Sequence, residues 1–151
     1  MKRSLKLAVA VALPLVAGLA VLWLGYPPVA KAQKGCTAQM LRGEYGVHLQ
    51  GWIYPDWPQK TRVPGSQIGI GSFDGSGNAV MLVTSAVDGE IGPPDTIEYT
   101  YEVNADCTGS ITPRPGANGG PGRFVIVDGG RQFLGMGTQP GMVWSGTGIR
   151  Q

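Results

Sequence analysis

The segment Gln67–Val87 reads QIGIGSFDGSGNAVMLVTSAV, and this pattern decides the fold. Short apolar stretches, Gln67–Phe73 and Ala79–Val87, flank a glycine-rich centre, which is typical of two β-strands joined by a turn. The centre, Asp74-Gly75-Ser76-Gly77-Asn78, supplies glycine and asparagine where a tight turn needs positive φ. The segment therefore predicts a β-hairpin.

The same organisation extends through residues 33–151. Two further turns, Val87-Asp88-Gly89 and Asp128-Gly129-Gly130, have the same chemistry, and no apolar pattern occurs at helical spacing. Tyr54–Gly65 and Pro113–Gly122 are rich in proline or glycine and predict loops. Eight strands are expected, at Glu44–Gln50, Gln67–Phe73, Ala79–Val87, Thr96–Asn104, Gly109–Pro113, Arg123–Val127, Gln132–Thr138 and Met142–Ile149.

Eight sequential strands linked mostly by hairpins predict an all-β domain, an antiparallel up-and-down barrel. Closure into a barrel removes the unpaired edges that an open sheet leaves exposed. Glycines within the strands, such as Gly69, Gly71, Gly146 and Gly148, suit strong strand coiling and close packing in a small barrel. A β-sandwich is the alternative.

The first 32 residues have a different composition and predict a signal peptide. A basic start is followed by the uncharged, apolar stretch Leu7–Tyr26 and by Ala30-Lys31-Ala32, which has the form of a signal-peptidase site. Cleavage after Ala32 would make Gln33 the first residue of an extracytoplasmic domain, 33–151. The alternative is an uncleaved membrane anchor at residues 7–26, which are just long enough to span a bilayer.

Charge argues against nucleic acid as a partner. Four of the twelve basic residues lie in the leader, so eight remain against ten acidic residues, a net charge of about −2 after cleavage. The remaining basic residues are scattered singly, whereas binding to phosphates needs a basic face.

The two cysteines, Cys36 and Cys107, predict one disulfide, because an even count in an exported chain favours pairing. The bond would close a long loop and stabilise the domain by roughly 4 kcal/mol in the chain-entropy model.

Several stretches resemble a group of small secreted bacterial proteins with allene-oxide-cyclase-like barrels. They are Cys36-Thr37, Leu41–Gly46, Phe73–Asn78, Tyr99–Ser110, Phe124–Gly130 and Pro140–Thr147. The resemblance covers essentially all of residues 33–151 and implies an eight-stranded barrel with a lumen. Related barrels include plant cyclases and bacterial polyketide cyclases, but no catalytic motif of those enzymes matches here residue by residue, so no catalytic role is transferred.

Motifs for common chemistry are missing from the sequence. It has no nucleophile elbow, phosphate loop or zinc-protease motif, and His48 is its one histidine, so neither a metal site nor a cofactor is predicted. Asp74, Ser76 and Asn78 imitate the start of a calcium loop, but the later ligand positions do not fit, and a turn is expected. Glu98 and Glu102 share one strand face, and we expect that face to be solvated because Tyr99 and Tyr101 occupy the other.

Aromatic residues are the candidate ligand contacts. Trp52, Tyr54 and Trp57 cluster where the proline-rich loop begins, and Tyr99 and Tyr101 lie on a strand. A loop with two tryptophans above an apolar lumen would form a binding cleft, and core filling is the alternative for the two strand tyrosines.

Three functions follow, in order of preference. The first is non-catalytic binding of a small apolar ligand or a partner, which requires an accessible lumen. The second is a cyclase or isomerase, which requires an inward ionisable group such as Glu44, His48 or Glu98. The third is a structural or assembly role in the cell envelope, which requires an exposed apolar patch.

Overall fold

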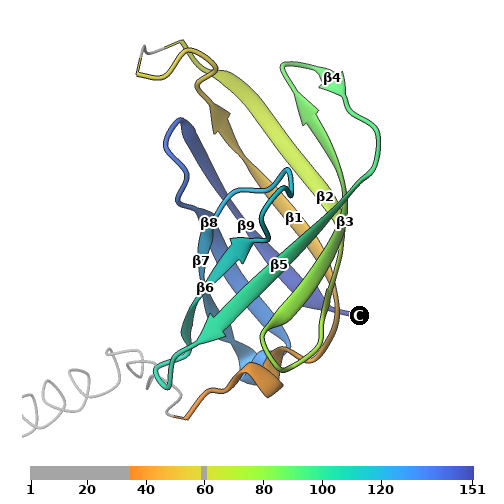
Figure 1. Cartoon of the computed structure of the whole chain (residues 1–151), viewed down its shortest axis with the longest axis vertical. Helices are drawn as coiled ribbons and strands as arrows, with labels where there is room; N and C mark the ends of the chain where they lie inside the picture. The colour runs from red at the N-terminus through yellow and green to blue at the C-terminus, as the bar shows by residue number, and fades with distance from the viewer. Residues whose placement is uncertain (1–34, 59–60) are drawn as a thin grey trace, which may run out of the picture. The chain divides into compact units, whose positions relative to one another are not determined.

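The computed structural model describes residues 35–58 and 61–151, which form an antiparallel β-barrel (Figure 1). The predicted leader, with Leu7–Tyr26 and the cleavage site after Ala32, lies outside the described residues. The elements are η1 (Ala38–Leu41), β1 (Gly43–Ile53), β2 (Val63–Phe73), β3 (Asn78–Val87), β4 (Glu90–Ile91), β5 (Asp95–Val103), β6 (Thr108–Pro113), β7 (Gly122–Val127), η2 (Asp128–Gly130), β8 (Gln132–Gly137) and β9 (Met142–Arg150).

Eight strands close the barrel, and the short β4 adds to the edge of β3. The strand order is β2-β1-β9-β8-β7-β6-β5-β3-β4, and pairing between β2 and β3 completes the ring. The predicted eight-stranded barrel is thereby confirmed, and each predicted strand corresponds to one observed strand. The loop expected at Tyr54–Gly65 is shorter than predicted, because β2 already begins at Val63.

Glycines let neighbouring strands approach closely, as the sequence suggested. A Cβ atom at Gly51 would collide with the carbonyl oxygen of Val143, and one at Gly146 with that of His48. Both glycines lie where β1 pairs with β9. Their missing side chains therefore permit the sharp coiling that closes a narrow barrel.

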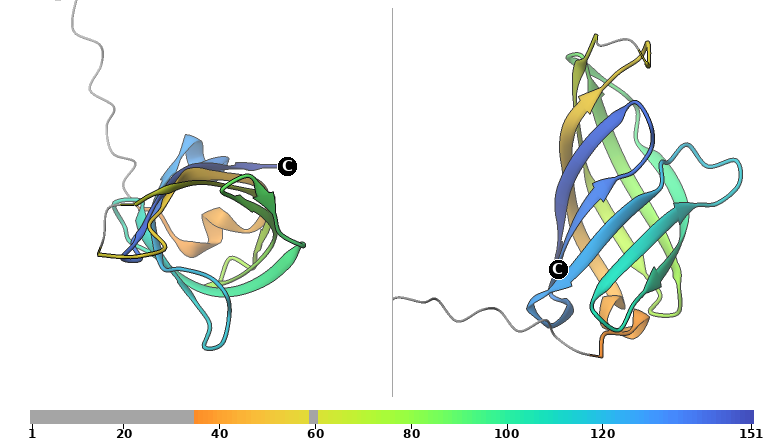
Figure 2. Two further views of the ribbon diagram at one scale, coloured as in Figure 1. Left: turned by 90° about the horizontal axis from the view of Figure 1, so that it is seen from above. Right: turned by 90° about the vertical axis from the view of Figure 1, so that its left-hand side faces the viewer.

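One end of the barrel is closed, and we call it the closed end. It carries η1, η2 and the tight turns 74–77 and 104–107, and the view from above shows η1 lying across the barrel interior (Figure 2). The opposite, open end carries the short turn between β8 and β9 and the longer connections between β1 and β2, β3 and β5, and β6 and β7.

Aromatic side chains fill the barrel near the closed end. Tyr45 is fully buried, and its ring centroid lies 5.4 Å from those of Phe73 and Phe133. Phe73 also packs edge-to-face on Tyr101 at 5.3 Å. Leu41 of η1, 1% exposed, completes this core.

Polar contacts join η1 and η2 to the strands at the same end. The Tyr45 hydroxyl donates to the carbonyl oxygen of Gly130 at 2.5 Å and accepts from Arg150 Nη2 at 2.7 Å. Arg150 Nη2 also lies within hydrogen-bond distance of the carbonyl oxygens of Met40 and Gly130. These contacts connect segments that are far apart in the sequence.

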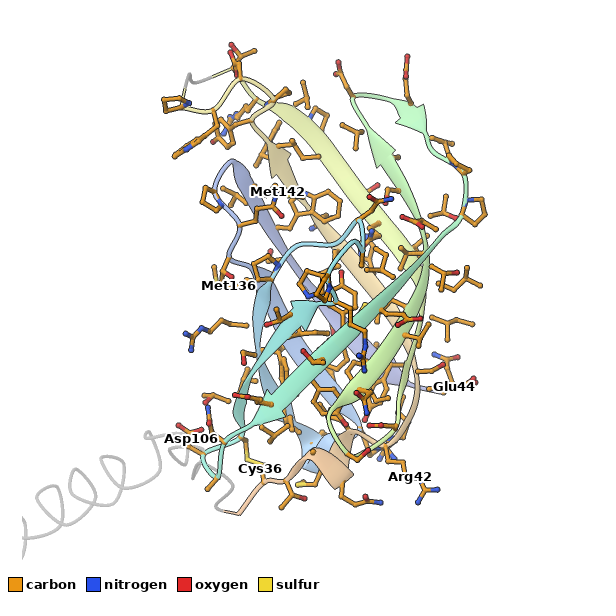
Figure 3. The ribbon with its side chains drawn as sticks, viewed as in Figure 1. Cys36, Arg42, Glu44, Asp106, Met136 and Met142 are labelled. Carbon is orange, nitrogen blue, oxygen red and sulfur yellow. A yellow bond between two sulfur atoms is a disulfide. The ribbon has the colours of Figure 1, made fainter. Side chains whose placement is uncertain are left out.

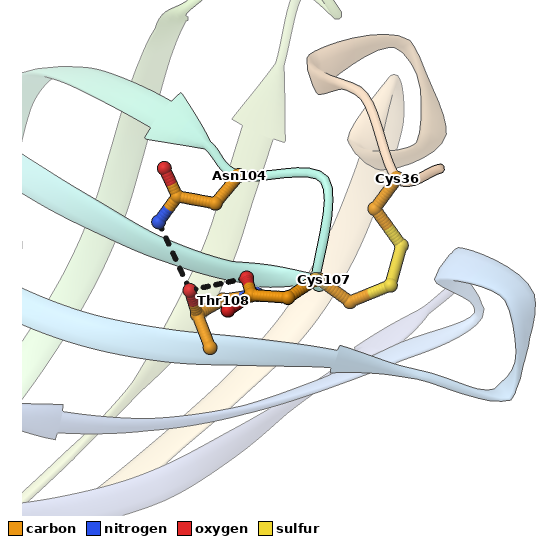
Figure 4. The surroundings of a disulfide bond; sticks show 5 residues. Cys36, Asn104, Cys107 and Thr108 are labelled. Carbon is orange, nitrogen blue, oxygen red and sulfur yellow. Dashed lines mark hydrogen bonds between the residues drawn. A yellow bond between two sulfur atoms is a disulfide. The ribbon is translucent and has the colours of Figure 1, made fainter. Parts of the chain in front are cut away.

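The predicted disulfide is present at the closed end (Figure 4). Cys36 and Cys107 are both buried, their Cα atoms are 5.0 Å apart, and they are separated by 71 positions in the sequence. Asp106 beside the bond accepts hydrogen bonds from the hydroxyl and backbone N–H of Thr108, which lower the pKa of its carboxyl group. The turn that carries Cys107 is thus held in shape by its own side chains.

The turn at residues 74–77 forms as expected. The Asp74 carboxylate accepts hydrogen bonds from the hydroxyl and backbone N–H of Ser76 and from the side-chain and backbone amides of Asn78. These bonds hold the pKa of Asp74 well below its usual value. Gly75 and Gly77 have positive φ, as the hairpin requires.

Candidate functional site

A cavity of about 300 Å³ occupies the barrel lumen on the side of the open end. Because strand side chains alternate between the two faces of a sheet, every strand of the barrel turns alternate residues into the lumen. The wall is mostly apolar and includes Leu49 of β1, Met81 of β3, Ile97 of β5, Phe124 of β7, Phe133 of β8 and Trp144 of β9.

Glycines leave the space that the cavity occupies. Gly135 and Gly137 are wall residues of β8, where side chains would otherwise project into the lumen. A Cβ atom at Gly137 would lie 3.7 Å from the Cβ of Trp144, an ordinary contact, and no closer heavy atom is present among the described residues. The lumen therefore has room near Gly137, whereas Phe133 on the same strand fills it further down.

The segment 118–122 between β6 and β7 forms part of the wall, and so does Met142 of β9 (Figure 3). The Tyr99 hydroxyl packs so closely beside Gly119 that a Cβ atom on that glycine would collide with it. Leu134 and Met136 are 46% and 56% exposed and form the outward-facing set of β8, although Met136 also borders the cavity. Inward and outward residues of this strand thus follow strict alternation.

A few polar groups interrupt the apolar wall. Gln67 Nε2 donates a hydrogen bond to the Ser85 hydroxyl at 3.0 Å, so each of these two polar side chains has a hydrogen-bond partner in the other. Burial, with a smaller contribution from the charge of Asp95, raises the pKa of Tyr99, so this hydroxyl keeps its proton. Trp144 is 8% exposed, and its buried indole Nε1 has no hydrogen-bond partner among the described residues.

The two predicted strand tyrosines both face inward, but they have different surroundings. Tyr99 lines the cavity. Tyr101 belongs to the filled core, where its hydroxyl donates to the carbonyl oxygen of Ala38 at 3.2 Å and its ring packs on Phe73. The structure therefore places Tyr99 at the candidate site and Tyr101 in the packing beneath it.

The three aromatic residues predicted at the mouth lie away from the described cavity wall. Trp52 is 39% exposed on the outer face of β1, and Arg62 lies over its ring, 4.2 Å from the centroid. Tyr54 and Trp57 pack edge-to-face at 6.0 Å, and the Tyr54 N–H donates to the carbonyl oxygen of Gly141. Trp52 faces outward because β1 turns Val47, Leu49, Gly51 and Ile53 inward.

The ionisable candidates for catalysis lie on the outside of the barrel. Glu44, His48 and Glu98 are all exposed, and Glu98 forms an ion pair with Arg114 at 3.6 Å. Glu102 is exposed as well, which confirms the expected outward face of β5. Within the described part of the chain, no carboxylate or imidazole lines the cavity, and no cluster of three or more potential ligand side chains could hold a metal ion.

Apolar side chains also lie on the outer face of the barrel, at the pair of strands β2 and β3. Ile68, Ile70, Val80 and Leu82 are between 43% and 64% exposed, and Ile70 lies directly opposite Leu82 in the sheet. The expected assembly role would use a surface of this kind.

Sequence reasoning missed Trp144 as a wall residue. Beyond Trp144, β9 turns Gly146 and Gly148 inward, whereas the apolar side chains of Val143 and Ile149 face outward, so alternation gave no clear sign of which face is buried. The one usable signal was the close packing implied by those glycines.

Comparison with known protein families gives no match for this chain, and a search of curated proteins gives none. The resemblance to allene-oxide-cyclase-like barrels therefore remains a prediction from the sequence stretches quoted above. Separately, none of the helices in the described ranges, 35–58 and 61–151, has the length and hydrophobicity to cross a membrane.

Proposed function

We propose that this protein is an exported, non-catalytic carrier or sensor that binds a small apolar molecule in the barrel lumen. The observation that carries the proposal is the cavity of about 300 Å³, which has a predominantly apolar wall. Eight-stranded barrels are just wide enough to be filled by side chains or to hold one small ligand, and glycines at Gly135 and Gly137 favour the second outcome.

The cavity volume sets the size of the ligand. An apolar cavity of about 150 Å³ holds one benzene molecule, so twice that volume suits a molecule of about twelve non-hydrogen atoms. If each non-hydrogen atom contributes about 0.3 to 0.7 kcal/mol of binding free energy, such a ligand would bind with a dissociation constant between roughly millimolar and micromolar.

The chemistry of the wall favours binding over catalysis. A cyclase or isomerase that works by acid–base catalysis needs an ionisable group within hydrogen-bond reach of the substrate. Glu44, His48 and Glu98 were the candidates, and all three are exposed on the outer face. Tyr99 has a raised pKa, which suits a hydrogen-bond donor better than a base.

The site of action that we propose is outside the cytoplasm. A buried disulfide persists in an oxidising compartment, and Cys36 and Cys107 form one here. The leader pattern in residues 1–32 agrees with export. Native mass spectrometry of the protein from its own host would report the mature mass, the disulfide and any retained ligand together.

Binding is tested with the uncharged dye 1-aminonaphthalene, which is no larger than the ligand size set by the cavity and whose emission shifts to shorter wavelength in an apolar site. We expect saturable binding to the purified domain. Gly137→Phe would place a ring in the lumen and reduce dye binding at least tenfold, since the space beside Trp144 is then occupied.

The matched control is Leu134→Phe, which introduces the same ring at an outward-facing position of the same strand that does not line the cavity. It should leave dye binding unchanged, and both variants should show the far-UV spectrum of the folded barrel. Equal loss of binding in the two variants, or none in either, would contradict binding in the lumen.

A further inference from the structure

The aromatic residues of the cavity wall include two hydrogen-bond donors that have no acceptor among the described residues. The Tyr99 hydroxyl lines the cavity and makes no hydrogen bond with another described residue. The indole N–H of Trp144 is buried and unpartnered within the same part of the chain. Leaving a buried donor unpaired is unfavourable, and native proteins rarely do so without a functional reason.

The two donors are positioned differently. Tyr99 presents its hydroxyl beneath the segment 118–122, directly at the wall. Trp144 rests the edge of its ring against Gly65, where a Cβ atom would lie 3.0 Å from Cζ2. Trp144 is also one of the residues that line the cavity. An indole N–H can only donate, so Trp144 specifies an acceptor on the ligand.

No residue in the described part of the chain turns a cation into the cavity, where it would neutralise an acid. Among the described residues along the cavity, Arg123 is the one with a positive charge, and it is exposed because β7 turns Phe124 and Ile126 inward instead. A carboxylate taken into an apolar cavity without a paired charge is strongly disfavoured.

We propose that the ligand is an uncharged molecule with an apolar body and one acceptor oxygen, such as the carbonyl group of a ketone or ester. Its oxygen accepts a hydrogen bond from the donor pair formed by Tyr99 and Trp144, while the body fills the apolar space near Gly137. This inference rests on the proposed function and specifies the chemical class of its ligand.

The test compares three probes by displacement of the dye from the full domain. They are 2-undecanone, 2-methyl-1-undecene, in which a methylene group replaces the carbonyl oxygen, and decanoate. Each is measured with the wild type and with Tyr99→Phe, Trp144→Phe and the double variant. The ketone-to-alkene affinity ratio isolates the hydrogen bond, because both probes lose the same packing when a ring is changed.

We expect the ketone-to-alkene affinity ratio to fall at least tenfold from the wild type to the double variant, and decanoate to bind at least tenfold more weakly than the ketone. An indole N–H resonance that moves downfield with the ketone, stays in place with the alkene and is absent in Trp144→Phe would identify the second donor directly.

Three results would overturn the inference. An unchanged ketone-to-alkene affinity ratio in the double variant would contradict the proposed hydrogen bond. Decanoate binding as tightly as the ketone would contradict the restriction to uncharged ligands. In both cases the probes still bind in the lumen, and the proposed function stands. If neither the ketone nor the alkene displaces the dye from the wild type, the proposed function fails together with the ligand class.

Discussion

The two halves of the barrel use the same strands but differ in what lies between them. Towards the closed end, Tyr45, Phe73 and Phe133 fill the interior, and a disulfide and the contacts of Arg150 hold η1 and η2 in place. Towards the open end, wall glycines leave a cavity and the connections are longer. The comparison indicates that stability is concentrated in one half, which leaves the other half free to carry a binding site.

Removing the disulfide at the closed end is the change with the largest expected effect on stability. The double variant Cys36→Ser/Cys107→Ser loses a cross-link between residues 71 positions apart, so the free energy of unfolding should fall by about 4 kcal/mol. Urea denaturation followed by tryptophan fluorescence measures the difference. Dithiothreitol should destabilise the wild type and have no effect on the variant.

The same double variant tests whether the two halves are independent. Where it is still folded, it should bind the dye with nearly wild-type affinity, because Cys36 and Cys107 are not among the residues that line the cavity. A large loss of dye affinity in the folded variant would show that the closed end shapes the site.

Removing the hydroxyl of Tyr45 should have the next largest effect on stability. Tyr45→Phe leaves the buried carbonyl oxygen of Gly130 with one donor fewer and deprives Arg150 of an acceptor, which should cost about 2 kcal/mol of unfolding free energy. Tyr54→Phe is the matched control at the open end, where the hydroxyl has no hydrogen bond to a described residue. An equal loss of unfolding free energy in both variants would contradict the conclusion that stability is concentrated at the closed end.

Two glycine-to-alanine substitutions should change stability with opposite signs at the two ends, and the change at the open end is the smallest expected effect. A Cβ atom at Gly148 would collide with the ring of Phe133, so Gly148→Ala should cost about 1 to 3 kcal/mol. Gly137→Ala meets no atom closer than 3.7 Å and should stabilise by about 0.5 kcal/mol, because alanine restricts the unfolded chain. Thermal unfolding of the two variants beside the wild type provides the measurement.

Turn chemistry and strand alternation were sufficient to predict the barrel. The hairpin around Asp74 formed with Gly75 and Gly77 at positive φ, as expected. The apolar face of β5 was assigned correctly, with Tyr99 and Tyr101 inward and Glu98 and Glu102 outward. These features are local, so a short stretch of sequence is enough to specify them.

The candidate site was harder to predict, because it depends on how strands meet around the ring. Trp52 was expected at the mouth, but β1 continues beyond Gln50 to Ile53, and its alternation turns Trp52 outward. Trp144 became a wall residue through pairings of β9 that no local pattern in the sequence reveals. Short elements such as η1 and β4 carry too few residues for a periodic signal.

The pairing of β1 with β9 has a consequence for the order of events when the chain is made. The register joins Tyr45 to Arg150, positions 105 residues apart, so one side of β1 has no partner until β9 has been synthesised. Pairings between distant segments place this topology among the slower folders, with times of roughly milliseconds to seconds. Closure of the barrel therefore waits until β9, the last of the described strands, has been synthesised.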